Sequence, residues 1–370
     1  MKVNSSDLEA ALKVTHVTVG SASDISSHYT FRERGGRLEV LSYDGRTFSS
    51  CLVPNVTPDD GATFTVEARR IHMMLESVGA NQSLEVSVAD SEVVVKGPRG
   101  KVTFSSLDPA MFPYWDDVLS GAKTTATIQA DRLSAAFNHA KQFIYDQEGK
   151  APHLCLAEFR KGVLHSTDQM AVSLVRVPGM EESGLRVYVK DLGNLLSFLG
   201  TAKGTDVEVL ETDRAFFLRR PDGAVFGETL YNHSFPPVNV DWDLVDDETW
   251  EVPQEDLLAA IKFLQSGAKL DEPRVRFHRE GESLTLSMVS VSGKPLPLTL
   301  TLTSVVQKDG AKGVPDFSVT DVYLGKMLNG NVNPKIKLGV TKKSAGGWVR
   351  IMDDRGPDTY LTTLAWLKTA

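Results

Sequence analysis

Apolar residues recur at helical spacing in three widely separated stretches of the chain. Each stretch carries two of them four positions apart, namely Leu8/Leu12, Leu133/Phe137 and Leu257/Ile261. Residues at i and i+4 share one face of an α-helix, so these pairs predict amphipathic helices. We place the helices at residues 7–17, 131–143 and 255–266. Alternating Val, Leu and Thr then predict strands at 38–53, 163–177 and 284–306.

A second helix is predicted after each set of strands. Its apolar spacing begins at Val66, Val189 and Val319. A hairpin with Gly or Pro in its turn follows, as in Arg220-Pro221-Asp222-Gly223. Each third of the chain therefore follows the order helix, strands, helix, strands, which is typical of an α+β unit.

The chain repeats itself at a period of domain length. A pentad of the form x-Leu-x-Ala-Ala occurs at residues 7–11, 132–136 and 256–260, and Phe112-Pro113 recurs as Phe235-Pro236. This period is too long for a solenoid unit and suits a whole domain. We predict three tandem domains, at residues 1–122, 123–246 and 247–370.

Composition narrows the class of protein. The 370 residues have ordinary globular proportions, with a formal net charge of −8 and only two cysteines. No stretch of 18 apolar residues occurs, and the N-terminus lacks the apolar core of a signal peptide. We expect a cytoplasmic protein without disulfides and without membrane contact. The negative net charge argues against binding of nucleic acid, but the location of the charges matters more than their sum.

Sequence motifs of enzymes are missing. Glycine-rich phosphate loops, metal-ligand spacings and nucleophile elbows do not occur, so we predict no catalytic residue, no metal and no cofactor. His165 and Asp168 fall on opposite faces of a strand, which argues against a catalytic dyad. We interpret His72-Met73-Met74 as helix packing. Asp116-Asp117 and Asp246-Asp247 are interpreted as solvated linker charges.

The order of these weak signals resembles a known family. The signals are Val66-Glu67-Ala68-Arg69-Arg70, Phe104-Ser105-Ser106-Leu107, Phe112-Pro113 and Leu164-His165-Ser166-Thr167-Asp168. In this order and spacing they resemble the bacterial-type DNA polymerase III sliding clamp (beta subunit, processivity factor). The chain looks like a divergent member, such as a phage replicon would encode.

The resemblance implies a ring. Two copies, each with three clamp domains of two helices packed on antiparallel sheet, would join head to tail around a hole lined by helices. It also implies a dimer interface in which the strand with Val102 and Phe104 meets Phe263 and Leu264 of another copy. The alternative is that these four residues are ordinary core.

The implied function is that of a non-catalytic DNA polymerase processivity factor. Such a protein encircles duplex DNA without sequence specificity and tethers its partners, which are a replicative DNA polymerase, a clamp loader and other proteins with a clamp-binding motif. The alternative is a triple-repeat protein-binding scaffold that does not encircle DNA. A hydrolase with a site assembled from dispersed residues is a third, weaker interpretation.

Charge placement on the helices is compatible with DNA. Acidic residues fall mostly in first helical turns, where the helix dipole favours them, so the helix bodies are more basic than the chain. The predicted DNA contacts are Lys13, Arg69, Arg70, Lys141, Lys262 and Lys326, together with Tyr145 and Gln147 of the loop after the second domain's first helix. The alternative for any one of them is a solvated surface charge. The first-domain loop at residues 20–26 lacks the arginine usual in the family.

The resemblance also implies a cleft for partner peptides between domains two and three. Its matching positions are Thr167, Asp168, Val172, Pro236, Val240, Leu361, Thr363 and Leu364. The family usually continues Thr-Asp with Gly-His-Arg-Leu, whereas this chain has Gln169-Met170-Ala171-Val172. We therefore expect a cleft of altered shape and peptide preference. The alternative is a plain strand-end turn at Thr167-Asp168 with Val172 in the core.

Overall fold

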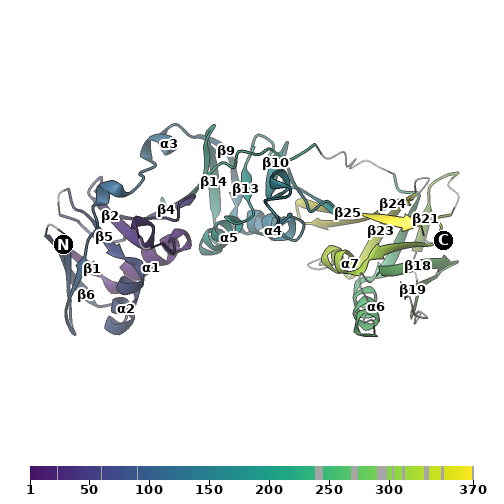
Figure 1. Cartoon of the computed structure of the whole chain (residues 1–370), viewed down its shortest axis with the longest axis horizontal. Helices are drawn as coiled ribbons and strands as arrows, with labels where there is room; N and C mark the ends of the chain where they lie inside the picture. Colours follow the sequence, from purple (N-terminus) through teal and green to yellow (C-terminus); the bar gives the residue numbers. More distant parts are fainter. Residues whose placement is uncertain are drawn as a thin grey trace. The chain divides into compact units, whose positions relative to one another are not determined.

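The described residues form two compact units. The computed structural model describes residues 1–22, 24–59, 61–89, 91–237, 245–267, 274–289, 298–301, 304–310, 313–328, 333–342 and 346–368 (Figure 1). Unit 1 comprises Met1–Phe137 and Gly179–Asn232, and unit 2 comprises Asn138–Pro178 and His233–Ala370. Within the described part of the chain, no helix is long and apolar enough to span a membrane.

Unit 1 contains the elements of the first third of the chain and part of the second. Its strands are β1 (Lys2–Asn4), β2 (His28–Arg34), β3 (Arg37–Tyr43), β4 (Thr47–Leu52), β5 (Thr63–Glu67), β6 (Ser83–Ala89), β7 (Glu92–Gly97), β8 (Gly100–Ser105), β9 (Lys123–Gln129), β13 (Arg186–Tyr188), β14 (Asp206–Glu211), β15 (Ala215–Arg219) and β16 (Val225–Thr229). Its helices are α1 (Ser5–Thr15), α2 (Ala68–Val78), α3 (Asp116–Ser120) and α5 (Leu192–Thr201), with short 3-10 turns η1 (His16–Thr18), η2 (Ile25–Ser27) and η3 (Pro109–Met111).

Two antiparallel sheets organise unit 1. One has four strands in the order β1-β6-β7-β8, and the other has eight in the order β5-β2-β3-β4-β16-β15-β14-β9. The larger sheet is continuous because β4 pairs with β16, with Phe48 opposite Gly227. One face of this sheet is covered by apolar side chains of the linker that contains α3, including Phe112 and Trp115.

Unit 2 contains the remaining elements. Its strands are β10 (Leu156–Arg160), β11 (Val163–Thr167), β12 (Ala171–Arg176), β17 (Glu248–Pro253), β18 (Arg274–Glu280), β19 (Ser283–Val289), β20 (Leu298–Thr301), β21 (Ser304–Gln307), β22 (Phe317–Thr320), β23 (Lys335–Lys342), β24 (Gly346–Arg355) and β25 (Asp358–Lys368). Its helices are η4 (Pro152–Leu154), α6 (Gln254–Gly267) and α7 (Asp321–Leu328), and α4 (Ala130–Lys141) crosses the boundary between the units.

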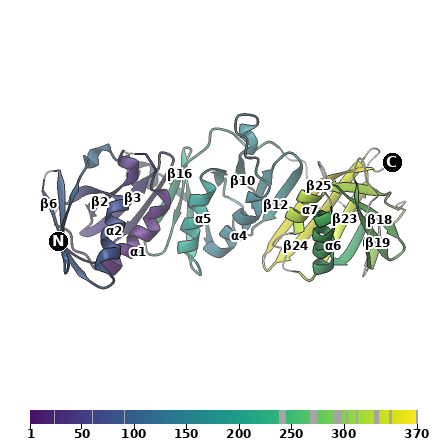
Figure 2. The same ribbon diagram turned by 60° about the horizontal axis from the view of Figure 1, so that its bottom comes forward.

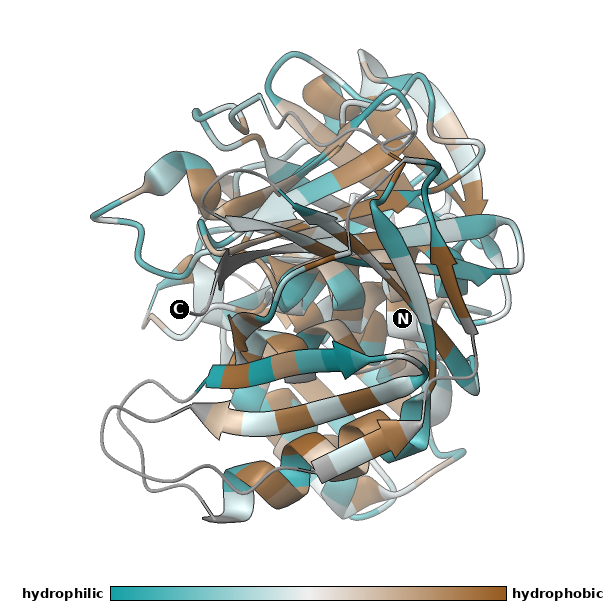
Figure 3. Ribbon diagram, turned by 90° about the vertical axis from the view of Figure 1, so that its right-hand side faces the viewer, coloured by the Kyte–Doolittle hydropathy of each residue, from teal (hydrophilic) through white to brown (hydrophobic). Residues whose placement is uncertain are grey.

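The strands of unit 2 are also antiparallel. They pair in the order β10-β11-β12-β25-β22-β18-β19-β20, while β25 also pairs with β24, β24 with β23, β23 with β17, and β17 with β21. Hydrophobic and hydrophilic residues follow one another along single strands (Figure 3). This alternation is the period of a sheet with two different faces.

The element order confirms the α+β repeat. Each third runs strand, helix, strands, helix, three strands, so that α1, α4 and α6 correspond, as do α2, α5 and α7. The predicted boundaries at 122/123 and 246/247 fall between α3 and β9 and between β16 and β17. The two compact units divide the middle third, because its β16 pairs with β4 of the first third and its β12 pairs with β25 of the last.

The first helix of each repeat is confirmed, with small shifts at its ends. The predicted apolar pairs are all buried, at 4% exposure or less. Burying one such Leu or Phe side chain contributes roughly 1.5–3 kcal/mol, which is why this periodicity determines the helix position. The helix α1 begins two residues earlier than predicted, because Asn4 is its N-cap and accepts a hydrogen bond from the Ser6 N–H at 2.9 Å.

The second helix of each repeat begins later than predicted. Val66 and Val319 belong to the strands β5 and β22, and Val189 precedes the N-cap residue Asp191 of α5. These strand valines are almost fully buried, as β-branched residues in a sheet commonly are. The helices α1 and α2 pack together in unit 1, and α6 and α7 pack together in unit 2 (Figure 2).

The interpretation of the linker aspartates as solvated charges was wrong for Asp116, Asp246 and Asp247, whereas Asp117 is exposed as predicted. Arg32 binds Asp116 through both terminal nitrogens, at 2.5 and 2.8 Å, and thereby fixes α3 to β2. Asp246 accepts from Arg350 Nε at 2.9 Å in unit 2. The backbone N–H of Lys342 donates to Asp247 at 2.8 Å. These carboxylates have partners far away in sequence, which local charge patterns do not reveal.

Candidate functional site

The predicted DNA contacts of unit 1 lie on its two packed helices. Lys13 of α1 and both Arg69 and Arg70 of α2 are exposed. The Arg70 guanidinium lies over the ring of Phe104, 5.6 Å from its centroid. Asp7 occupies the first turn of α1, and Glu67 is the N-cap residue of α2. Asp7 and Glu67 lie where the helix dipole favours acids, but Arg69 and Arg70 lie in the first turn of α2 and not, as predicted, on its body.

The predicted contacts of unit 2 are of two kinds. Lys141 at the end of α4, Gln147 of the following loop and Lys262 of α6 are exposed, and Tyr145 is half-buried. Lys326 is different, because its Nζ lies 3.6 Å from Asp168 Oδ2 and 4.8 Å from the Tyr323 ring centroid. Burial, followed by the Asp168 charge, raises the pKa of Tyr323. The structure thus joins a predicted DNA contact to a predicted cleft residue.

The predicted cleft positions gather where β12 meets β25. Val172 lies opposite Thr363, and Leu174 lies opposite Leu361. Because residues two apart point to the same side of a strand, these four side chains share one face of the sheet. The Thr167 hydroxyl donates to the Ala171 carbonyl at 2.7 Å, which closes the turn between β11 and β12.

The structure describes some of the remaining cleft positions but not all of them. Pro236 is half-buried, and its carbonyl accepts from Arg160 at 3.4 Å. The backbone of Leu364 pairs with Ala171. Val240 lies outside the described residues. Leu361 and Thr363 are buried at 1% and 4% exposure, whereas Val172 is half-buried and the neighbouring Met170 is 48% exposed. Met170, part of the departure from the family pattern at 169–172, is thus an exposed apolar side chain next to the predicted cleft positions.

The four predicted dimer residues separate into two kinds. Phe104 and Leu264 are core residues, at 1% and 4% exposure, as the alternative interpretation expects. Their neighbours Val102 and Phe263 are exposed, at 39% and 58%. Val102 stands on β8, which is the last strand of its four-stranded sheet. An exposed apolar residue on a sheet edge is available to a further strand.

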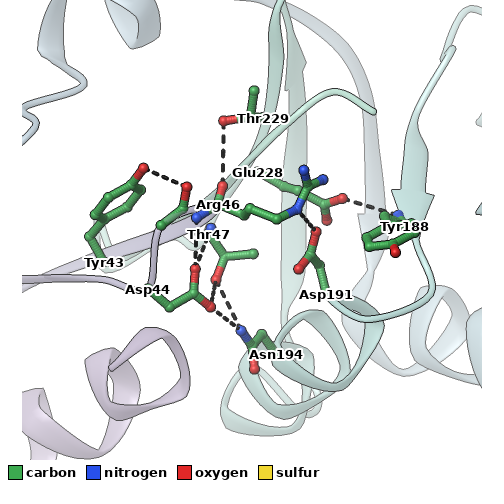
Figure 4. Close-up of polar contacts among 10 residues, drawn as sticks. Tyr43, Asp44, Arg46, Thr47, Tyr188, Asp191, Asn194, Glu228 and Thr229 are labelled. Carbon is green, nitrogen blue, oxygen red and sulfur yellow. Dashed lines mark hydrogen bonds and ion pairs between the residues drawn. The ribbon is translucent and has the colours of Figure 1, made fainter. Parts of the chain in front are cut away.

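A buried polar cluster, which sequence reasoning missed, joins the first two thirds of the chain inside unit 1 (Figure 4). Arg46 Nε donates to Asp191 at 2.7 Å, and its guanidinium lies over the stacked rings of Tyr188 and Tyr231. The Tyr188 backbone N–H donates to Glu228 at 3.1 Å. The cluster connects the turn before β4, the start of α5 and the strand β16.

The electrostatics of this cluster follow from burial. Glu228 is fully buried, and burial together with the Asp191 charge raises its pKa well above the usual value. Burial also raises the pKa of Asp191, in opposition to its bond with Arg46. Burial therefore favours the neutral form of Glu228, and Arg46 balances Asp191. The arrangement holds the junction together.

Two histidines and a tyrosine form a second cluster that the sequence did not reveal. His16 Nδ1 lies 2.9 Å from the Tyr29 hydroxyl, which lies 2.8 Å from His72 Nε2. The packing interpretation of 72–74 was therefore right for Met74, at 6% exposure, but wrong for His72 and for Met73, which is 59% exposed. Spacing along one helix could not show it, because the residues come from η1, β2 and α2.

Comparisons with known proteins find similarity among solved structures. No protein-family model matches the sequence, and no curated protein matches it. The DNA polymerase III subunit beta from Pseudomonas aeruginosa superposes with a TM-score of 0.81 at 15% identity, over 100% of both chains. The DNA polymerase sliding clamp from Bacillus subtilis gives 0.81 at 14% identity, over 100% of this chain and 99% of that chain.

A third solved structure gives the same result. The Caulobacter crescentus pol III beta matches with a TM-score of 0.81 at 14% identity, over 100% of this chain and 99% of that chain. Sequence identities this low show a shared fold and nothing more. The repeated clamp-type topology and these full-length superpositions together show that this chain has the fold of the bacterial DNA polymerase III beta sliding clamps.

Proposed function

We propose that this chain is a DNA sliding clamp. In this proposal two copies, each with domains at 1–122, 123–246 and 247–370, close a ring around duplex DNA in the cytoplasm. The ring has no catalysis of its own, and it tethers a replicative polymerase and other proteins to DNA after a clamp loader has opened it. The observation that carries the proposal is the full-length likeness to solved sliding clamps.

The strand pairing between repeats supports ring closure. The fourth strand of one repeat pairs with the last strand of the next repeat. In unit 1 this pair is β4 with β16, and in unit 2 it is β12 with β25. By this rule the last strand of the first repeat, β8, and the fourth strand of the third repeat, β20, remain without a partner from another repeat among the described residues. Both are terminal strands in the pairing order of their sheets.

Pairing β8 of one copy with β20 of another would repeat the same junction. The contact is heterologous, so it closes only if rotation brings the last copy back to the first. Two copies of three repeats give six junctions of one kind. Val102 and Phe263 are the exposed apolar residues that we assign to this contact, while Phe104 and Leu264 support it from the core behind.

The helix charges support sequence-independent contact with DNA. Exposed cations on the helices, such as Lys13, Arg69 and Lys262, attract phosphates without reading bases. Because the chain as a whole carries −8, the remaining surface repels the duplex. A ring needs no tight contact, and mobile, salt-sensitive attraction permits sliding.

The face formed by Val172 and Thr363 supports a peptide cleft. An extended partner segment would lie along the β12–β25 junction, with Met170 and Pro236 at its margins. The departure from the family pattern at 169–172 leads us to expect a partner motif with a different apolar anchor.

Topological retention on DNA tests the proposal without a loader. Preformed dimers are threaded onto linear duplex with biotinylated ends, the ends are capped with streptavidin, and the complex is washed in high salt. A clamp stays bound until a restriction enzyme cuts the duplex, and it never stays on uncapped DNA. Retention that ignores the state of the ends would favour the protein-binding scaffold instead.

A charge-reversal variant locates the DNA-facing surface. We expect Arg69→Glu with Arg70→Glu to reduce threading at least several-fold while light scattering still shows a dimer. The matched control is Lys161→Glu with Arg214→Glu, which reverses two exposed cations in turns between strands. Equal threading by both double variants would contradict the assignment of α2.

A further inference from the structure

A recess on unit 1 brings two histidines to the helices to which we assign DNA contact. It has a volume of about 530 Å³, and its lining includes His16, His72, Arg69, Glu67 and Glu76. His16 and Arg69 are exposed, and His72 is half-buried. The rings of the two histidines lie edge to face, with centroids 4.9 Å apart.

One hydroxyl connects the two rings. The Tyr29 oxygen lies 2.9 Å from His16 Nδ1 and 2.8 Å from His72 Nε2. Tyr29 itself is fully buried, and burial raises the pKa of its phenol, so it stays protonated. A phenol carries one hydrogen and can also accept a hydrogen bond. It therefore donates to one histidine and accepts from the other.

This geometry limits the number of protons that the three residues can hold. The histidine that donates to Tyr29 has its second ring nitrogen turned away, and a proton added there breaks no bond. The other histidine accepts the phenol hydrogen. A proton added to that accepting nitrogen would face the phenol hydrogen, and the fully buried Tyr29 would lose one of its two hydrogen bonds. Two charged rings at 4.9 Å would also repel each other.

We propose that His16, Tyr29 and His72 form a relay that takes up one proton, and only one, and so strengthens, as the pH falls, the contact between Arg69 and a phosphate. The ligand is a backbone phosphate of duplex DNA. The inference rests on the proposed clamp function for its ligand, but the proton count rests on the hydrogen-bond geometry alone.

The surrounding charges set the direction of the effect. Glu67 and Glu76 face the recess, and Glu9 of α1 acts on His72 from the adjacent helix. These three carboxylates outnumber Arg69 and weaken its attraction for phosphate while the relay is neutral. One added proton reduces this excess of negative charge. Burial and the His16 ring lower the pKa of His72.

The neighbouring histidine on the same strand is not part of the relay. His28 is adjacent to Tyr29 in β2, but its Nδ1 lies 3.0 Å from the Asp24 carbonyl oxygen and 3.1 Å from the Ser27 hydroxyl. It therefore has partners of its own.

Histidine titration by NMR tests the proton count. The full-length protein carries eight histidines, and the signals of interest are assigned with His16→Gln and His72→Gln. We expect one of the two rings to titrate near neutral pH and the other to remain neutral down to the onset of acid unfolding. In Tyr29→Phe, which keeps the buried ring and removes the hydroxyl, both rings should titrate. Two separate titrations near neutral pH in the wild-type protein would overturn the relay.

The salt dependence of DNA binding tests the phosphate contact. The logarithm of the binding constant falls with the logarithm of salt by roughly 0.9 for each neutralised phosphate. Between pH 8 and pH 6, measured with a short duplex by fluorescence anisotropy, the slope should steepen by up to about 0.9 in the wild-type protein. It should stay constant in His16→Gln with His72→Gln. The control His153→Gln removes an exposed histidine of η4 and should behave like the wild type.

The two measurements separate the possible failures. A single titrating ring without any DNA binding at either pH would refute the clamp function and leave the relay intact. Normal DNA binding with a slope that does not depend on pH would refute the phosphate contact.

Discussion

Arg46 and Asp191 form an ion pair with a distance of 2.7 Å between Nε and Oδ2, although they are 145 residues apart in sequence. Asp191 is buried, and Arg46 also covers the ring of Tyr188 at 5.0 Å. The pair connects the first two repeats beside the β4–β16 junction. Because Asp191 is buried, breaking this ion pair should lower the free energy of unfolding more than breaking a surface pair.

The first prediction concerns removal of that cation. Arg46→Ala should destabilise unit 1 by about 3–5 kcal/mol, because it leaves the Asp191 carboxylate buried without its partner. Denaturant unfolding would measure the change. The control Arg214→Ala removes an exposed side chain paired with Asp213 and should change stability by less than about 0.5 kcal/mol. Similar effects of the two substitutions would show that the cluster is not coupled.

The second prediction concerns Glu228. Its pKa is raised in the folded state by burial and by Asp191, so the unfolded chain releases its proton at lower pH than the folded chain. The stability that this group supports is therefore complete below its unfolded pKa and is lost as the pH rises. Glu228→Gln should weaken this loss and raise the melting temperature above pH 7 by a few degrees. Glu208→Gln, in an exposed pair with Arg219, is the control.

The third prediction concerns acid stability of unit 2. His139 is buried against Tyr360, its Nε2 lies 3.1 Å from the Thr362 hydroxyl, and burial lowers its pKa to about 3. Below about pH 6.5 the unfolded chain binds a proton at His139 that the folded chain does not bind. The free energy of unfolding therefore falls by about 1.4 kcal/mol for each unit by which the pH is lowered. His139→Gln should remove this dependence, as thermal unfolding between pH 5 and 7 would show. The exposed His153→Gln should leave it unchanged.

The fourth prediction separates adjacent residues of α6. Leu264→Ala should destabilise the fold by about 2–5 kcal/mol, because the side chain is 4% exposed. Phe263→Ser should change stability little, because this ring is 58% exposed, but it should weaken dimer formation if our ring proposal holds. Sedimentation at decreasing concentration would measure the dimer. Unchanged self-association of Phe263→Ser would contradict the interface assignment.

Much of the fold could be predicted because it depends on local periodicity. The pairs Leu8/Leu12 and Leu257/Ile261 are buried as predicted, since an apolar face at helical spacing must find a core whatever it packs against. The onset of each second helix was harder to predict. Val66 and Val319 fit a helix start by apolar spacing alone, but both are buried in strands, namely β5 and β22.

The candidate site could be predicted only in part. Exposed cations such as Lys13 and Arg69 follow from their position on amphipathic helices. Lys326 does not, because its neighbour Asp168 comes from a distant turn. The linker aspartate Asp116 was taken for a solvated charge, and its bidentate contact with Arg32 comes from a strand more than 80 residues away.

By itself, the sequence determined the three-fold repeat, the α+β order of each copy and the apolar faces of the helices, because these depend on spacing along the chain. Only the tertiary structure decided which polar groups meet. The contacts of Tyr29 with His16 and His72, and the cluster around Arg46, join residues from separate elements. A buried donor or acceptor requires a partner in space, and the sequence does not record which distant residue supplies it.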